Sequence, residues 1–347
     1  MEPWEGSEVQ NFLSRAEPLN NGRWRIWYTV RNRRGPFYIA VAEGIPGEPM
    51  RRTRIVTSEQ DAPWSIEGLP DDWHPAQPVH LQLPNGRHRL YFWAYGPSVA
   101  RYLAAESDDE QHYRIINAAE PCLYHPNDRA AVGVAEARAL GLTPSIGRLP
   151  ERPAHEPSAR GELICNDATN VYQLADGSFE LYSPGLIRVP RDDPRFIAHD
   201  NAAGLLRVID RWVSADGLHW TGRRRVIEQD ANDPQDQQFY YLAVTYTPQG
   251  RVGMLGHYRV QAQTMDLEWC FSADGLQWQR PLRIPWIRRG REGEPDSYAI
   301  YACSSLVQYA DKWWLFYTGM NMAHNYRHSH GSPHSVIMLA TTDSIWT

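Results

Sequence analysis

Acidic side chains stand at three places where a polar segment passes into an apolar, aromatic one, and these acids are the first candidates for chemistry. Asp167 and Asp236 each precede such a segment, and Glu294 and Asp296 together precede a third. Carboxyl groups that meet in one place repel one another, so one binds a proton while another stays ionised, as general acid and base roles require. We therefore predict that these four residues are catalytic. The alternative for each is a turn cap or an ion pair.

Four further residues are expected to bind a substrate beside these acids: Asn166, His80, Tyr240 and His324. His324 opens a histidine-rich loop whose imidazoles could line a pocket or hold a metal. A loop rich in Gly, Ser and Pro does not fix metal ligands in one geometry. We therefore expect no metal and no cofactor.

A repeated heptapeptide indicates the elements that would position these side chains. Residues 214–220 read Ser-Ala-Asp-Gly-Leu-His-Trp, and residues 272–278 read Ser-Ala-Asp-Gly-Leu-Gln-Trp. Weaker copies occur at 105–109, 341–346 and 41–44. Ser and Asp can bind turn amides, Gly adopts a positive φ and Trp packs on the adjoining sheet, so each copy predicts a hairpin.

Each copy follows a strand-like aromatic segment, which extends the repeat to a whole unit. These segments are 24–28, 89–93, 179–182, 251–255 and 313–317, and inner strands are expected ahead of them, for example at 79–83 and 244–246. The pattern predicts an all-β, five-bladed β-propeller with four-stranded antiparallel blades, in which inner strands bring distant acids to one axis. A β-sandwich with coincidental turns is the alternative.

The boundaries of this single domain, 1–347, follow from the copies. Blades are predicted at roughly 20–60, 75–116, 163–230, 237–288 and 297–347, and the insertion at 117–162 contains a possible short helix at 136–140. Long insertions on a propeller often shape a binding site, although a plain surface loop is the alternative.

Composition narrows the classes of partner. A formal net charge of -6 without a long basic run argues against nucleic acid, and no segment is apolar for long enough to cross a membrane. The start lacks the regions of a signal peptide, so a cytoplasmic location is expected. The four cysteines form no Cys-x-x-Cys pair, so buried thiols are expected. The sequence does not indicate the oligomeric state.

The hairpins and the acids at strand starts resemble the five-bladed glycoside hydrolases, namely family 43 and the invertase-like family 32. The stretch that includes 236–240, 272–280, Asp296 and 317–319 is most similar to bacterial family 32-like proteins. The likeness covers roughly the last 190 residues well and the first 120 only by blade pattern. The segment 166–170 is similar to the family 32 nucleophile motif but lacks its Pro and Gly, Arg-Asp-Pro is echoed only at 191–194, and the Glu-Cys acid motif has no counterpart.

The resemblance implies a carbohydrate substrate and a glycosidase activity. Asp167 would be nucleophile or base, and Glu294, Asp296 or Asp236 would be the acid. Cleavage would be retaining for carboxyl groups about 5 to 5.5 Å apart and inverting for about 6.5 to 9.5 Å. The alternatives are a propeller that binds a glycan or protein without catalysis, and a glycosyl-transferring or phosphorolytic relative.

Overall fold

The structure is a computed structural model, and it describes residues 12–31, 37–56, 65–96, 100–124, 162–164, 168–200, 203–325 and 327–346. The regular elements among these residues are β-strands, apart from one 3-10 turn at Asn20–Gly22, and turns and loops connect them. In these ranges no helix has the length and apolar character to span a bilayer. The possible helix at 136–140 and most of the predicted insertion lie outside the described residues.

The first two sheets comprise the strands before residue 125. The first has the order β1-β2-β3-β4 and the second β5-β9-β8-β7-β6, with β10 beside β8. Their bounds are β1 (Phe12–Pro18), β2 (Trp24–Arg31), β3 (Phe37–Gly44), β4 (Arg51–Val56), β5 (Ser65–Glu67), β6 (His74–Gln82), β7 (His88–Tyr95), β8 (Ala100–Ser107), β9 (His112–Ile115) and β10 (Leu123–Tyr124).

The remaining strands form two further sheets. The third has the order β11-β13-β14-β15 with β12 beside β13, and the fourth runs β16-β17-β18-β20-β22-β21 with β19 and β23 at its sides. Within the fourth, a single parallel pair, Met265 with Ala299, joins two antiparallel groups. The bounds are β11 (Glu162–Ile164), β12 (Asn170–Gln173), β13 (Phe179–Arg188), β14 (Leu205–Ser214), β15 (Thr221–Ile227), β16 (Gln237–Thr247), β17 (Gly250–Arg259), β18 (Thr264–Ser272), β19 (Pro285–Ile287), β20 (Ala299–Ala302), β21 (Val307–Tyr309), β22 (Lys312–Met320) and β23 (Ser335–Thr342).

The aromatic segments predicted as strands are confirmed, because they fall within β2, β7, β13, β17 and β22. These strands lie in the interior of their sheets, paired along both edges, and most of their side chains are buried. Trp24, Trp27, Trp93 and Trp212 are among the largest side chains that are fully buried. β1 begins at Phe12, ahead of residue 20, where the first blade was predicted to start.

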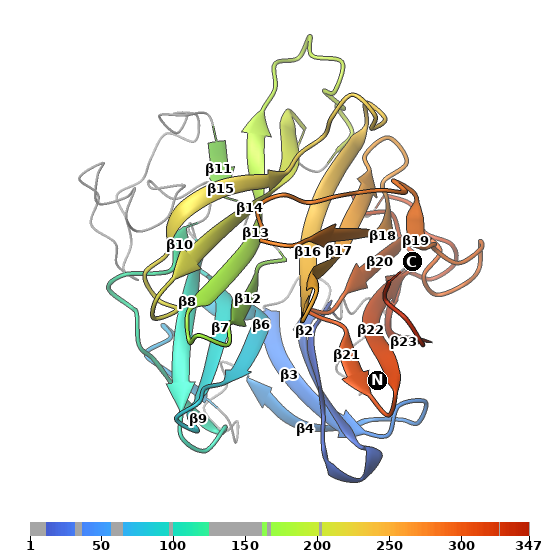
Figure 1. Ribbon diagram of the computed structural model, residues 1–347. Helices are drawn as coiled ribbons and strands as arrows, with labels where there is room; N and C mark the ends of the chain where they lie inside the picture. The colour runs from blue at the N-terminus through green and yellow to red at the C-terminus, as the bar shows by residue number, and fades with distance from the viewer. Residues whose placement is uncertain are drawn as a thin grey trace.

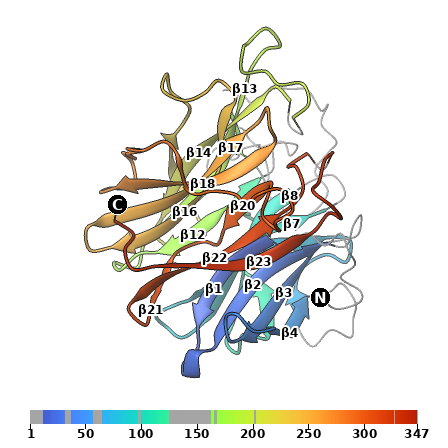
Figure 2. The same cartoon turned by 90° about the vertical axis from the view of Figure 1, so that its right-hand side faces the viewer.

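The sheets succeed one another around a common centre, so that the last lies beside the first (Figure 1). Figure 2 shows β22 and β23 next to β1 and β2. The backbone amide of Ser304, after β20, donates to the carbonyl oxygen of Ser14 in β1 at 2.9 Å. The arrangement is that of a β-propeller whose ring is closed by contacts between the first and the last strands of the chain.

The repeated turn has the predicted hydrogen bonds. The amides of Leu218 and His219 donate to Asp216 Oδ1 at 2.8 and 2.9 Å, and the amide of Gly217 donates to Ser214 Oγ at 2.9 Å. The turn at 272–278 repeats all three bonds. Closing the turn with side chains leaves no buried amide without an acceptor.

These turns define two ends of the molecule. We call the end where β14 and β18 finish in the repeated turns the hairpin end. The opposite end, where β6, β14, β16 and β18 begin, is the loop end. The loops that follow β13, β17, β19 and β22 lie at the loop end, so residues 189–204, 260–263, 288–298 and 321–334 are brought to one side.

Candidate functional site

A buried group of polar and aromatic side chains lies at the loop end, and we call it the Asp200 cluster. It consists of Asp200, Arg207, Tyr240, Tyr258, Tyr301 and His324. They come from the loop after β13, from β14, β16, β17 and β20, and from the loop after β22. Polar side chains far apart in sequence thus meet at one end of the sheets, as a propeller fold allows.

Asp200 is the acid of this cluster. Arg207 donates to its Oδ2 at 2.9 Å, and the Tyr258 hydroxyl donates to its Oδ1 at 2.7 Å. Burial opposes the charge on Asp200, but the nearby guanidinium and these hydrogen bonds outweigh burial and hold the pKa of Asp200 below its usual value. Asp200 is therefore an ionised, fixed carboxylate.

Arg207 is held by more than its carboxylate partner. Its guanidinium lies over the rings of Tyr240 and Tyr258, at 5.2 and 5.1 Å from their centroids. Its Nη1 also donates to Gln238 Oε1 at 2.8 Å. A cation between two aromatic faces and a carboxylate keeps both its position and its charge.

His324 provides a neutral imidazole at the same place. Its Nδ1 lies 2.8 Å from the Tyr301 hydroxyl, and its ring meets the Tyr240 ring edge-on at 4.6 Å between centroids. Burial, together with the charge of Arg207, lowers the pKa of His324 to about 3. At neutral pH this imidazole can donate one hydrogen bond and accept another.

The other predicted acids at the loop end form a second group, before β20. Asp296 is buried, and the Tyr317 hydroxyl donates to its Oδ2 at 3.3 Å. A Cβ built on Gly290 would lie 2.3 Å from Asp296 Oδ1 and 2.4 Å from Glu294 Oε2, so these two carboxylates approach the same point. Gly319 gives Asp296 room in the same way, because a Cβ there would lie 2.7 Å from the Asp296 Cβ.

Asp236 is engaged in an ion pair. Arg259 Nη2 donates to its Oδ1 at 2.6 Å, and the amide of Gln261 donates to its Oδ2 at 3.1 Å. These contacts tie the start of β16 to the turn after β17. Asp236 is thus held in an ion pair, and its catalytic role stays a prediction.

Asn166 and Asp167 lie outside the described residues, so their roles stay predictions. Their neighbour Ala168 is described, and it packs against the hydrophobic group that contains Tyr240 and Tyr301. Ala168 has φ +37°, which is uncommon for a residue with a side chain, and such strain gathers at functional sites. The chain next to Asp167 therefore reaches the Asp200 cluster.

His80 lies at the hairpin end, away from Tyr240 and His324. It pairs with Leu90 near the finish of β6, and its Nδ1 lies 2.9 Å from Glu17 Oε1. Within the described ranges, His80, His88 and Glu110 are the one group of His, Cys, Asp or Glu ligand atoms close enough to share a metal ion.

Sequence reasoning missed Asp200, Arg207, Tyr258 and Tyr301, because it considered only acids at the starts of inner strands. Arg207 carried a usable signal, since it interrupts the apolar run of β14 and is buried there. A charged residue inside an apolar strand is rarely buried without a fixed partner.

No family model matches the chain, and no curated protein does. Solved structures do match over almost the whole length. An N-acetylgalactosamine deacetylase from F. plautii in complex with blood group B trisaccharide is 14% identical, over 96% of this chain and 90% of that one, with a TM-score of 0.55.

Two family 43 structures give the same result. A thermostable family-43 glycoside hydrolase is 14% identical, over 98% of this chain and 91% of that one, with a TM-score of 0.56. The GH43_1 enzyme from Xanthomonas citri complexed with xylose is 13% identical, over 97% and 88%, with a TM-score of 0.53. The chain has the fold of the propeller glycoside hydrolases.

Proposed function

We propose that the protein is a glycoside hydrolase that cleaves a glycosidic bond at the loop end of a five-bladed propeller. The observation that carries this proposal is that the loop end holds the Asp200 cluster and two further features. These are the strained residue that follows Asp167 and the paired carboxylates before β20. Chemistry on a sugar needs carboxylates and fixed hydrogen-bonding groups in one place, and the loop end holds both.

The count of five blades rests on contacts between successive sheets. Gln77 in β6 bonds Thr29 in β2, Trp93 in β7 bonds Thr169 before β12, and Asn170 in β12 bonds Leu242 in β16. Val244 in β16 bonds Ser304, which in turn bonds Ser14. Dividing the fourth sheet at its single parallel pair gives five units in one ring.

Within this proposal Asp167 is the nucleophile or base, and Asp296 or Glu294 is the acid. Tyr240 and His324 hold the sugar through a ring face and a hydrogen bond, since an aromatic face covers the C–H side of a pyranose. The neighbouring structures support a carbohydrate partner, because two of them contain blood group B trisaccharide and xylose.

The test is hydrolysis of aryl glycosides of arabinose, xylose, fructose, galactose and glucose. Asp167→Asn and the double variant Asp296→Asn/Glu294→Gln should each lower kcat/KM on the active substrate by at least about 100-fold, because general acid–base catalysis contributes about that much. Asp108→Asn is the matched control, since its carboxylate is 84% exposed in a turn at the hairpin end. It should keep full activity.

Two results would contradict the proposal. One is the absence of turnover on the whole panel with well-folded protein. The other is activity that survives in both of these variants. Glycan binding without turnover would favour the non-catalytic propeller. Turnover that requires inorganic phosphate would favour phosphorolysis; one neighbouring structure, at 12% identity, comes from the GH130 family of mannoside phosphorylases, which also contains glycoside hydrolases.

A further inference from the structure

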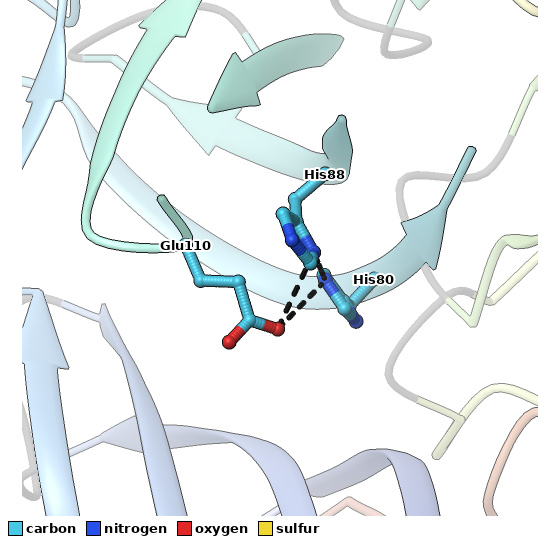
Figure 3. Close-up of side chains that lie close together, drawn as sticks. All are labelled: His80, His88 and Glu110. Atoms are coloured by element: carbon cyan, nitrogen blue, oxygen red, sulfur yellow. Dashed lines mark hydrogen bonds and ion pairs between the residues drawn. The ribbon is translucent and has the colours of Figure 1, made fainter. Parts of the chain in front are cut away.

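We infer that the hairpin end carries a binding site for a divalent transition metal of the Zn²⁺ type, with His80, His88 and Glu110 as ligands. His80 Nε2 lies 3.2 Å from His88 Nδ1, and Glu110 Oε1 lies 3.6 and 3.3 Å from these two atoms (Figure 3). Donors around tetrahedral Zn²⁺ with bonds of about 2.0–2.2 Å stand about 3.3–3.6 Å apart. The triangle has the size of one coordination face.

Comparison with the repeated turns shows that the backbone of Glu110 is strained in its turn. Asp109 accepts the amides of Gln111 and His112 at 2.8 and 2.9 Å, as Asp216 accepts those of Leu218 and His219. Glu110 thus occupies the position of the glycine in the other turns. Its φ is +59°, against +75° at Gly217 and +77° at Gly275. A side chain in this strained conformation points to a role for its carboxylate.

His80 is oriented as metal-binding histidines usually are. Its Nδ1 lies 2.9 Å from Glu17 Oε1, and its ring stacks on Trp27 at 4.5 Å between centroids. A carboxylate can only accept, so Glu17 accepts the Nδ1 proton, which leaves the lone pair of Nε2 directed at His88 and Glu110. This is the carboxylate–histidine–metal arrangement.

Arg25 orients the third ligand. Its Nη1 donates to Glu110 Oε1 at 2.7 Å and to Oε2 at 2.9 Å, and its Nε donates to Glu43 at 2.8 Å. A carboxylate offers about four lone-pair sites, so Glu110 can bind the cation and keep Arg25 as a partner. Glu43 and Glu17 compensate the positive charge that Arg25 places beside the ion.

The ligands come from β6, β7 and the turn between β8 and β9, whereas their supporting partners come from β1 and β2. In the structure the two imidazole rings are stacked, with 5.4 Å between their centroids and 12° between their planes. Binding of one ion by both rings would therefore require His88 to turn about its side-chain torsions. The side chains of His88 and Glu110 are 15% and 17% exposed, so water reaches the fourth position. The bound ion would link β6 and β7 of the second sheet to the turn between β8 and β9.

The test uses the full chain, stripped with a chelator and titrated with Co²⁺ and then Zn²⁺. We expect one Co²⁺ per chain with the visible absorption of a four-coordinate ion, its displacement by Zn²⁺, and a higher Tm with Zn²⁺. Glu110→Gly restores the residue of the other turns, and Glu110→Gln keeps the side-chain shape. Each of these two substitutions, and separately His88→Ala, should weaken Co²⁺ binding by at least about tenfold.

His112→Gln is the matched control, because His112 lies in the same turn with a side chain that is 75% exposed. It should bind Co²⁺ as the parent does. Absence of the Co²⁺ spectrum in the parent would overturn the inference. Equal binding by folded Glu110→Gly, Glu110→Gln and the parent would also overturn it. Circular dichroism establishes that each variant is folded. None of these readouts depends on glycosidase activity.

Discussion

The Asp200 cluster combines a charged pair with a neutral imidazole, and each depends on the other. Arg207 keeps Asp200 ionised, and the same guanidinium helps burial to keep His324 uncharged. The result is a group with fixed donors and acceptors that does not change its charge at neutral pH. Such a group suits the orientation of a polar substrate.

A pH dependence of stability follows from the lowered pKa of His324. His324 has a folded pKa of about 3 and an ordinary unfolded value of 6.5, so only the unfolded state binds its proton between these values. The stability that neutral His324 allows is therefore present above about pH 6.5 and is lost as the pH falls toward 3, by up to about 1.4 kcal/mol per pH unit. Urea unfolding at pH 7, 6, 5 and 4 measures it.

His324→Gln should show a shallower loss of stability over that window, because glutamine does not titrate. His112→Gln is the control, since the exposed His112 ring keeps access to water in both states. Parallel pH profiles for the parent and His324→Gln would contradict the burial of an uncharged imidazole.

At the level of single residues, sequence reasoning identified Tyr240 and His324, which the structure brings into ring contact. It could not place Asp200, because Asp200 lies in a loop whose path depends on contacts with β14 and β17. It assigned His80 to substrate binding because β6 is an inner strand. A strand of nine residues reaches both ends of the molecule, and sequence alone does not say which end a side chain serves.

The repeated turn is the element that sequence predicted best, and it carries a prediction about glycine. A Cβ on Gly217 would lie 2.4 Å from the Tyr91 hydroxyl and 2.7 Å from Arg89 Nη1, and φ there is +75°. Gly177 has φ +87° but nothing within 4 Å of such a Cβ. Gly177→Ala should cost about 1–2 kcal/mol from backbone strain, and Gly217→Ala should cost more because of the added clash.

Thermal unfolding of the two variants measures the difference. Equal Tm values for the two variants would contradict the close contact of Gly217 with Tyr91 and Arg89 in β7, because they would mean that β7 moves away without loss of stability. The turn was predictable because its hydrogen bonds are local, within seven residues. The loop-end segments were not, because their partners are distant in sequence, as the bond from Tyr258 to Asp200 shows.

Buried ion pairs that cross between sheets contribute to the stability of the whole molecule. Glu180 in β13 binds Arg211 of its own sheet, and it binds Arg251 Nη2 at 2.7 Å and the Tyr246 hydroxyl at 2.6 Å from the next sheet. Burial opposes the charge on Glu180, but its partners outweigh burial and keep its pKa low. Glu180 is therefore one of the contacts that join the third sheet to the fourth.

Glu180→Gln should lower the free energy of unfolding by about 3 kcal/mol, because the buried carboxylate is lost and two partly buried guanidinium groups lose their counter-charge. Glu67→Gln is the control, since Glu67 pairs with Arg114 at the surface, where both side chains are about two-thirds exposed. It should change stability by less than about 1 kcal/mol. Denaturant unfolding at neutral pH measures the free energy of unfolding of both variants. Similar losses of that free energy in the two variants would contradict a structural role for Glu180.

The opposite placement of the loop end and the hairpin end has a practical consequence for handling the protein. Gln277 lies exposed in a repeated turn, whereas Cys122, Cys270 and Cys303 are buried free thiols. A thiol introduced at Gln277 should therefore react with a maleimide ahead of these three. Attached to a bead or a sensor chip through that position, the molecule would present its loop end to the solution and leave it open to dissolved glycans.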